Sequence, residues 1–194
     1  MFSGIIQATG KVNAIEISGS TIRIQVTSSI SSGLHIDQSI SHDGICLTVV
    51  KVENDSHWVE IVKETISKTT FGSLKKDQLI NLETSLTLNT LLDGHLVQGH
   101  VDTTLKCLEL TDEQGSWSMK FNLPNEFTKL VIPRGSICLN GVSLTIANLF
   151  DDSFEVAIIP YTFHHTNFQH LKAGDEVNVE FDLIGKYLLR QNAK

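Results

Sequence analysis

The chain of 194 residues contains an internal repeat whose offset, 97 positions, is half of its length. The first copy reads Ser-Ile-Ser-His-Asp-Gly-Ile-Cys-Leu-Thr from Ser39 to Thr48, and the second reads Ser-Ile-Cys-Leu-Asn-Gly-Val-Ser-Leu-Thr from Ser136 to Thr145. The same offset continues without a gap to position 83, and it aligns Thr65 with Thr162, Thr69 with Thr166, Phe71 with Phe168, Leu74 with Leu171, Lys75 with Lys172, Asn81 with Asn178 and Glu83 with Glu180. A period of half a chain indicates two copies of one domain rather than a solenoid of short repeats. We therefore expect two like domains, which can hold two like molecules.

Each half is predicted to be all-β, because its apolar residues alternate with polar ones. Clean alternation occurs in Thr21–Val26, Trp117–Phe121 and Val177–Asp182, and a period of two residues is typical of a half-buried strand. Turn signals such as Asp43-Gly44 and Asn140-Gly141 separate such runs. Many short strands with regular turns indicate small barrels or sandwiches.

The halves meet around residues 86–94, and the predicted domains are residues 1–90, 91–182 and a terminal helix at 183–194. With a gap of two residues the repeat extends back to align Gly4-Ile5-Ile6 with Gly99-His100-Val101. The terminal segment places Leu183, Ile184, Tyr187 and Leu188 on one helical face and has no counterpart in the first half. A helix of about ten residues is too short to be stable alone. It packs on its own barrel or on another subunit, and we favour the subunit contact.

Composition excludes several classes of function. The net charge of −7 argues against nucleic acid or an anionic membrane surface as a partner, and no apolar run approaches the roughly 20 residues of a membrane helix. The three cysteines are Cys46, Cys107 and Cys138, an odd and unclustered set that indicates neither a disulfide framework nor a zinc site. Residues 94–100 have the glycine spacing of a phosphate loop without its Lys-Ser/Thr. We expect a cytoplasmic protein without a metal.

A pair of equivalent polar clusters remains as the candidate for chemistry. Each copy carries Gly-x-x-Leu-Thr, beginning at Gly44 or Gly141, beside a strand that ends at Thr65 or Thr162. The glycine permits close approach of a backbone, and the threonine hydroxyl can donate and accept hydrogen bonds. Such groups suit a flat heterocycle with imide-like edges. One copy alone could be ordinary turn and strand chemistry, but its retention in both halves favours a ligand site.

Five segments carry a family resemblance: Met1–Ile5, Gly44–Val49, Gly94–Asp102, Gly141–Thr145 and Gly185–Tyr187. Together, in collinear order over essentially the whole chain, they closely resemble the riboflavin synthase family of the duplicated-barrel, α-chain type. The resemblance implies two tandem six-stranded Greek-key β-barrels followed by a short C-terminal helix that helps to build a homotrimer.

The reaction that the resemblance implies is a transfer between two molecules of 6,7-dimethyl-8-ribityllumazine. One gives a four-carbon unit to the other, and the products are riboflavin and 5-amino-6-ribitylamino-2,4-pyrimidinedione. The family uses no cofactor and no metal, and each active site lies between the N-terminal barrel of one subunit and the C-terminal barrel of its neighbour. An association with lumazine synthase is left open.

The resemblance also implies a set of substrate-binding residues for each barrel. The N-terminal set is Gly4, Ile5, Ile6, Cys46, Leu47, Thr48, Glu60, Ile61, Val62, Lys63, Glu64 and Thr65. The C-terminal set is Gly99, His100, Val101, Arg134, Ser143, Leu144, Thr145, Ala157, Ile158, Ile159, Pro160, Tyr161 and Thr162.

The candidate catalytic residues are Ser39, Cys46, Thr48, His100, Thr145 and Asp182. His100 is the candidate for proton transfer at neutral pH. The polar groups of the first copy would orient or supply a nucleophile, with Cys46 as a buried thiol rather than a covalent nucleophile. Asp182 would be the partner of a hydroxyl or histidine across a subunit boundary.

Two residues stay open, and several positions depart from the family pattern, Asp43, Asn140 and Arg134 among them. His95 is either a structural donor or a site residue, and Phe2 either packs at the site or is simply buried. Asp43 stands where the family has asparagine, Asn140 where it has aspartate, and Arg134 where it has lysine, which changes reach and geometry. The rival hypothesis is a non-catalytic antenna protein of the same fold that binds a lumazine or flavin.

Overall fold

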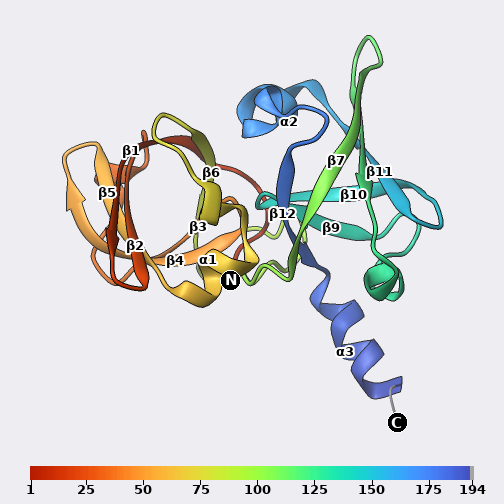
Figure 1. Ribbon diagram of the computed structural model, residues 1–194, viewed down its shortest axis with the longest axis horizontal. Coiled ribbons are helices and arrows are strands. Elements are labelled where there is room, and N and C mark those ends of the chain that lie inside the picture. The colour runs from red at the N-terminus through yellow and green to blue at the C-terminus, as the bar shows by residue number, and fades with distance from the viewer. Residues whose placement is uncertain (193–194) are drawn as a thin grey trace.

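The computed structural model describes residues 1–192, which form two closed β-barrels side by side and a helix that projects from the second (Figure 1). The N-barrel contains β1 (Ala8–Ser18), β2 (Thr21–Thr27), β3 (Ser39–His42), β4 (Ile45–Glu53), β5 (Ser56–Ile61) and β6 (Leu79–Thr84). The C-barrel contains β7 (Thr103–Asp112), β8 (Trp117–Asn122), β9 (Ser136–Leu139), β10 (Val142–Leu149), β11 (Ser153–Ile158) and β12 (Glu176–Phe181). The predicted terminal segment 183–194 ends in two positions that lie outside the described residues.

Both barrels have one topology, so the all-β duplicated fold is confirmed. The N-barrel order is β1-β2-β5-β4-β3-β6 and the C-barrel order is β7-β8-β11-β10-β9-β12, with antiparallel neighbours throughout. Because β2 pairs with β5 and β3 with β6, each barrel is a Greek key. The predicted domain boundary between residues 90 and 91 stays a prediction.

β-Bulges occur at matching places in the two copies. Register shifts fall between Val49 and Lys51 in β4 and between Ile146 and Asn148 in β10, at the repeat offset. A bulge inserts one residue, bends its strand and increases the twist. These paired bends allow each six-stranded sheet to close on itself.

Each barrel interior is filled by side chains and leaves the ligand motif outside. Phe71 and Phe168, equivalent residues, are buried in the two apolar cores, and truncating either to alanine would cost about 3–5 kcal/mol. In β4 the alternation buries Leu47 and exposes Thr48, and Leu144 and Thr145 repeat this arrangement in β10. The polar half of each Gly-x-x-Leu-Thr motif therefore lies on the outer face of its barrel.

The short helices are where prediction was incomplete. Two six-residue helices, α1 (Lys63–Lys68) and α2 (Pro160–His165), follow β5 and β11 and were not expected from the sequence. The 3-10 helices are η1 (Ser31–Gly33), η2 (Thr70–Ser73), η3 (Asn125–Leu130) and η4 (Asn167–His170), and the last element is the α-helix α3 (Leu183–Asn192). The expected terminal helix is confirmed as α3. In residues 1–192 no helix is long and apolar enough to cross a membrane.

Candidate ligand sites at the exchanged leading segments

The chain places a short leading segment before each barrel, residues 1–7 before the N-barrel and residues 94–102 before the C-barrel. These two segments pair with one another through Phe2 and Val97, whose amides each donate to the other's carbonyl at 2.7 and 3.1 Å. Phe2 is fully buried and forms a small apolar cluster with Val97, Cys138 and the partly buried Cys46. The open question about Phe2 is thus answered in part, since the ring packs directly beside one motif cysteine.

Each leading segment then crosses to the opposite barrel. The Gly4 carbonyl accepts a hydrogen bond from the Ser143 amide of β10 at 2.8 Å, and the Gly99 carbonyl accepts one from the Cys46 amide of β4 at 2.8 Å. Ile6 packs against the C-barrel core, whereas Val101 packs against the N-barrel core. The two halves therefore exchange their leading segments.

This exchange corrects the grouping expected from the sequence. Gly4, Ile5 and Ile6 were assigned to the same site as Cys46, and Gly99, His100 and Val101 to the same site as Ser143. The hydrogen bonds place the segments the other way round. The repeat offset shows which residues are equivalent, but it does not say which half receives each segment.

Glycine is required at both crossing points. Gly4 and Gly99 have φ values of 77° and 80°, a region that L side chains rarely adopt. A Cβ on Gly4 would lie 2.6 Å from the Ser143 Cβ, and one on Gly99 would lie 2.5 Å from the Cys46 Cβ. Only a residue without a side chain allows these backbones to meet.

Two buried glutamates, neither of them among the predicted site residues, hold the leading segments in place. Glu83 at the end of β6 accepts hydrogen bonds from the Ser3 amide and hydroxyl, both at 2.7 Å, and from the Gly4 amide at 3.0 Å. Its repeat partner Glu180 on β12 accepts from the amides of residues 98–100 at 2.6–2.8 Å. Burial raises the pKa of both carboxyls, and these hydrogen bonds partly oppose that rise. Their exact repetition in the sequence was the signal that could have identified them.

Hydroxyls and thiols line the outer faces of the two motif strands. Thr48 lies opposite Ser39 in the β3–β4 ladder, so the structure brings these two predicted residues together. Cys46 lies opposite Ser41, whereas in the second copy Ser143 lies opposite Cys138. In each copy this cross-strand pair thus consists of one serine and one cysteine. The cysteine lies on β4 in the N-barrel, whereas it lies on β9 in the C-barrel. The sites are related but chemically unlike.

The C-barrel motif has a histidine that the N-barrel motif lacks. His95 Nδ1 lies 2.7 Å from the Ser143 hydroxyl, and its amide donates to the Ser3 carbonyl at 3.1 Å. Burial lowers the pKa of His95 below its usual value, and the negative charge of Asp182 partly opposes that shift. The imidazole is therefore neutral at neutral pH.

The other predicted polar residues are placed as follows. His100 follows Gly99, so it lies in the segment that crosses to Cys46, and its side chain is exposed. Asp182 Oδ1 accepts a hydrogen bond from the Ile184 amide at 2.9 Å, so this carboxylate caps α3. Arg134 has a φ of 63° and sits in the turn that precedes β9, with its amide donating to the Ile146 carbonyl.

The helices that follow β5 and β11 carry different side chains in the two copies. Glu64 and Lys68 of α1 form an exposed ion pair at 2.8 Å, whereas the equivalent Tyr161 and His165 of α2 stack with ring centroids 4.0 Å apart. Among the predicted binding residues here, Ile61 and Ile158 belong to the barrel cores. Their neighbours Val62 and Ile159 are 56% and 60% exposed. Of these four apolar residues, only Val62 and Ile159 can offer side chains to a ligand.

Neither Gly-x-x-Leu-Thr motif strand lines either of two cavities within residues 1–192. One cavity, of about 710 Å³, lies between the barrels at Asp43 and Asn140, and its lining contains none of the predicted site residues. A second cavity of about 360 Å³ includes only Ile5 of that set. Within residues 1–192 no three potential ligands cluster as a metal site would require. Each motif is an open half-site, bounded by exposed apolar groups such as Ile5, Val62 and Ile159.

Comparison with known proteins agrees with this architecture. A profile of the lumazine binding domain matches residues 3–85 and 98–182. The riboflavin synthase of Bacillus amyloliquefaciens is 36% identical over 98% of this chain and 89% of its own length, and that of Saccharomyces cerevisiae is 35% identical over 98% and 86%. A crystal structure of LumP with riboflavin superposes with a TM-score of 0.87 at 26% identity, covering 93% of this chain and 99% of LumP. LumP with 6,7-dimethyl-8-(1'-D-ribityl) lumazine gives a TM-score of 0.85 at 24% identity, with the same coverage.

Proposed function

The chain belongs to the riboflavin synthase family of duplicated lumazine-binding domains, and from that premise we propose that it catalyses the dismutation of 6,7-dimethyl-8-ribityllumazine. One molecule gives a four-carbon unit to a second. The products are riboflavin and 5-amino-6-ribitylamino-2,4-pyrimidinedione. Two substrates and two products balance without an oxidant or reductant, so no cofactor is part of the proposal.

The observation that carries this proposal is the exchange of the leading segments. It supplies two half-sites with the same backbone frame, one at Cys46 with Gly99 and one at Ser143 with Gly4. Two like frames suit two molecules of one substrate. Because the side chains at the two frames differ, one molecule could give the four-carbon unit while the other receives it.

The reaction needs a proton acceptor at one lumazine and a nucleophile at the other. The C7 methyl of a lumazine is acidic because its carbanion delocalises into the pteridine ring, and the second lumazine is activated by addition at C7. His95 and Ser143 form a hydrogen-bonded pair suited to proton relay at the C-barrel half-site. His100 would transfer a proton at the N-barrel half-site. Cys46 and Thr48 would orient the ligand or a hydroxyl there.

Orientation of the two rings would supply much of the rate. Holding two reactants in register can contribute roughly 7–11 kcal/mol to lowering a barrier. The remaining predicted residues, including Ile5, Ile159 and Tyr161, would line the apolar walls that exclude water. Removing one polar group would then lower the rate less than disturbing the relative orientation of the two rings.

We further propose that the active site forms between subunits of a homotrimer. Both half-sites are open in the single chain, and α3 leaves Ile184, Tyr187 and Leu188 between 56% and 67% exposed. An N-barrel half-site of one subunit facing a C-barrel half-site of the next would place two lumazines together. An association with lumazine synthase stays a prediction.

The alternative function is a non-catalytic antenna that binds a lumazine or flavin in one barrel. The structural similarity to LumP bound to riboflavin supports this alternative. Equilibrium titration with riboflavin, followed by quenching of its fluorescence, separates the two. Our proposal expects two bound ligands per chain and release of all ligand on dilution, whereas one tightly retained ligand per chain would favour the antenna.

A further inference from the structure

The two barrels meet at a polar seam that the proposed reaction does not use. We define this seam as Asp43, Thr70, Asn81, Asn140, Asn167 and Asn178. Asp43 and Asn140 are equivalent turn residues with φ values of 47° and 45°, each followed by a glycine. A Cβ on Gly44 would lie 2.8 Å from the Gly141 amide nitrogen, so the two turns abut.

Most hydrogen bonds of the seam obey the twofold symmetry of the repeat. The Asn81 amide donates to Asp43 Oδ1 at 2.7 Å, and the Asn178 amide donates to Asn140 Oδ1 at 2.8 Å. Each of these asparagines also reaches across the seam: Asn81 Nδ2 donates to the Asn140 carbonyl and Asn178 Nδ2 to the Asp43 carbonyl, both at 2.9 Å. The last strands β6 and β12 thereby fix the position of the opposite turn.

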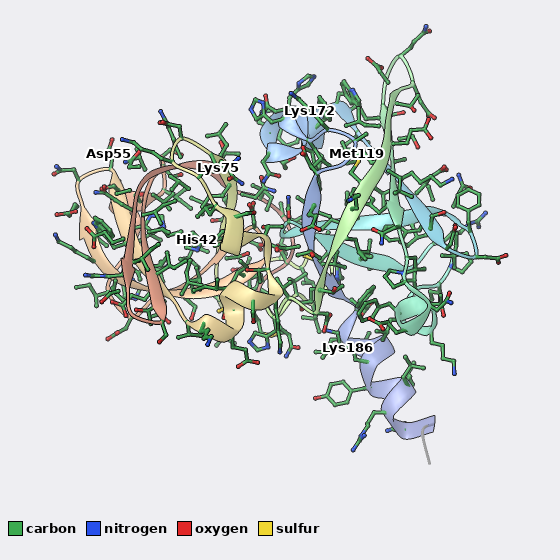
Figure 2. The ribbon with its side chains drawn as sticks, in the orientation of Figure 1. His42, Asp55, Lys75, Met119, Lys172 and Lys186 are labelled. Atoms are coloured by element: carbon green, nitrogen blue, oxygen red, sulfur yellow. The ribbon has the colours of Figure 1, made fainter. Side chains whose placement is uncertain are left out.

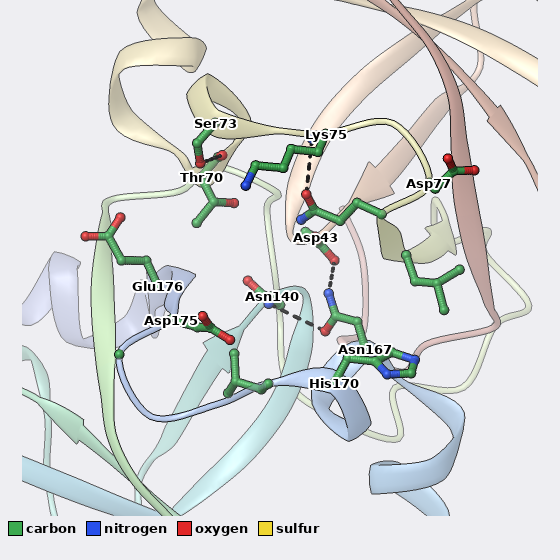
Figure 3. Close-up of a pocket in the computed structure, with 14 residues that line it drawn as sticks. Asp43, Thr70, Ser73, Lys75, Asp77, Asn140, Asn167, His170, Asp175 and Glu176 are labelled. Carbon is green, nitrogen blue, oxygen red and sulfur yellow. Dashed lines mark hydrogen bonds between the residues drawn. The ribbon is translucent and has the colours of Figure 1, made fainter.

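The symmetry breaks in charge at Asp43, which is 2% exposed. Its Oδ1 receives both the Asn81 amide and, from the other barrel, Asn167 Nδ2 at 2.9 Å (Figure 3). Among the described residues every hydrogen bond to this carboxyl ends on Oδ1. Burial raises the pKa of Asp43 to about 8, and the hydrogen bonds from Asn81 and Asn167 partly oppose that rise.

The charged groups around Asp43 line the 710 Å³ cavity rather than contact the carboxyl. The loop between η2 and β6 contributes Lys75 and Asp77, and Asp77 is paired with Lys11 at 2.7 Å. The C-barrel side contributes His170 of η4, Asp175, and Glu176 of β12 (Figure 3). The partners from β6, from the β9–β10 turn and at the start of η4 are uncharged asparagines. Asp43 is therefore the one ionisable side chain within the hydrogen-bonded seam as defined.

We propose that Asp43 is a positioning residue whose protonation state sets the relative position of the two barrels and, through it, both ligand half-sites. Asp43 and Asn140 stand three residues before Cys46 and Ser143, on the same hairpins. Each motif strand also holds the leading segment of the other half, so a shift at the seam moves both half-sites together. The expected effect on ligand binding rests on the proposed function, whereas the hydrogen bonds of the seam do not depend on it.

The protonated and ionised forms differ physically. A neutral carboxyl keeps Oδ1 as acceptor for Asn81 and Asn167 while Oδ2 carries the proton. A carboxylate would bury a negative charge whose hydrogen bonds all fall on one oxygen, which is costly. Because the folded pKa lies above the unfolded value of 3.8, the stabilisation is complete below pH 3.8 and is lost as pH rises to about 8.

The test compares the wild type with Asp43→Asn, which copies the residue at the equivalent position 140. Asp77→Asn, at an exposed aspartate on the same cavity, is the control. In the wild type we expect the midpoint of thermal unfolding to fall between pH 6 and pH 9, and riboflavin binding, measured by fluorescence quenching, to weaken by about threefold. In Asp43→Asn both changes should largely disappear, and in Asp77→Asn both should persist.

A pH profile of Asp43→Asn equal to that of the wild type would overturn the proposal. If that variant does not fold, carbon-13 titration of aspartate carboxyls in the wild type decides, because one carboxyl should titrate near pH 8. The absence of any aspartate titrating between pH 6 and pH 10 would also overturn it. A protein that binds no riboflavin would contradict the proposed function alone, since unfolding and carboxyl titration still test the seam.

Discussion

At the scale of single residues, the twin half-sites differ where proton transfer would occur. Ser143 has a histidine 2.7 Å from its hydroxyl, whereas its repeat partner Cys46 packs against the apolar cluster of Phe2, Val97 and Cys138. A hydroxyl paired with a neutral imidazole can pass a proton in either direction. A thiol among apolar groups is suited to packing. We therefore propose that the relay acts at the C-barrel half-site.

Replacing His95 tests this relay. His95→Gln should lower kcat by about 10²-fold, as expected for loss of a general acid–base group, while riboflavin affinity changes little. The wild-type rate should persist below pH 6.5 because burial lowers the pKa of His95. The rate of lumazine turnover between pH 5 and pH 9 is the measurement. An unchanged pH profile in His95→Gln would mean that His95 is only structural.

A second residue-scale feature is a pair of buried histidines in the N-barrel, His42 and His57; Figure 2 shows His42 within this barrel. The Nε2 atoms of His42 and His57 lie 2.9 Å apart, and His57 Nδ1 lies 2.9 Å from the Ser31 hydroxyl. Burial lowers the pKa of His57 to about 4 and that of His42 well below its usual range. The C-barrel has Leu139 and Phe154 at these positions.

This pair should make the N-barrel sensitive to acid. Both rings are neutral in the folded protein, so their contribution is complete above the unfolded pKa of about 6.5 and is lost as pH falls toward 4. We expect the unfolding free energy to drop by on the order of 2 kcal/mol between pH 7 and pH 5. The double variant His42→Leu/His57→Phe should lose that drop in urea titrations at the two pH values. Equal acid sensitivity in both proteins would refute this assignment.

At the scale of elements, the leading segments carry the organisation of both half-sites. Each is anchored by a glutamate of its own barrel, Glu83 or Glu180, and delivers a glycine to the motif strand of the other. The segment 94–102 therefore does more than connect the barrels. It forms one wall of the N-barrel half-site.

Alanine at the crossing glycines should disrupt these walls one at a time. Gly99→Ala should cost about 2–4 kcal/mol of stability through its positive φ and its clash with Cys46, and it should remove the N-barrel ligand. Gly4→Ala should do the same to the C-barrel ligand. Gly33→Ala and Gly115→Ala, where a Cβ meets nothing within 4 Å, are the controls. Riboflavin titration should give one ligand per chain in each crossing variant, and two per chain would contradict the exchange.

The elements were only partly predictable from the sequence. The strands and the duplication followed from alternation and from the repeat, because burial of one strand face fixes a period of two; that the strands close into barrels rather than sandwiches followed only from the family resemblance. The helices α1 and α2 did not, since six residues are too few to show a helical period. The exchange could not be predicted either, because equivalence of Gly4 and Gly99 is the same whichever barrel receives them. The role of His95 could not be predicted from the sequence, because the serine that it contacts is 48 positions away.

At the scale of the whole molecule, α3 is tied to the C-barrel yet leaves an apolar face uncovered. Lys186, which Figure 2 labels on α3, forms a 2.6 Å ion pair with Asp102, and the carboxylate of Asp102 also accepts a hydrogen bond from the Phe181 amide at 2.9 Å. The helix thus projects in a fixed direction with Ile184 and Tyr187 exposed. A fixed, exposed apolar face is what a subunit contact requires.

Charge on that face should break the assembly. Ile184→Lys/Tyr187→Lys should convert a trimer into monomers that retain both barrels, and turnover should fall with it because each half-site loses its neighbour. Arg190→Ala, on the exposed polar part of α3, is the control. Sedimentation velocity gives the mass, and circular dichroism shows whether the barrels remain folded. A monomeric wild type with full turnover would contradict assembly across subunits.

The central claim is that two lumazines react in one protein without a cofactor, and turnover tests it most directly. The purified protein, freed of bound chromophore, is incubated with 6,7-dimethyl-8-ribityllumazine while riboflavin absorbance is followed and the pyrimidinedione is quantified. We expect many turnovers per chain, with two lumazines consumed and one pyrimidinedione released for each riboflavin formed. Saturable binding of the lumazine with no riboflavin formed would contradict the claim and identify the protein as a binding protein.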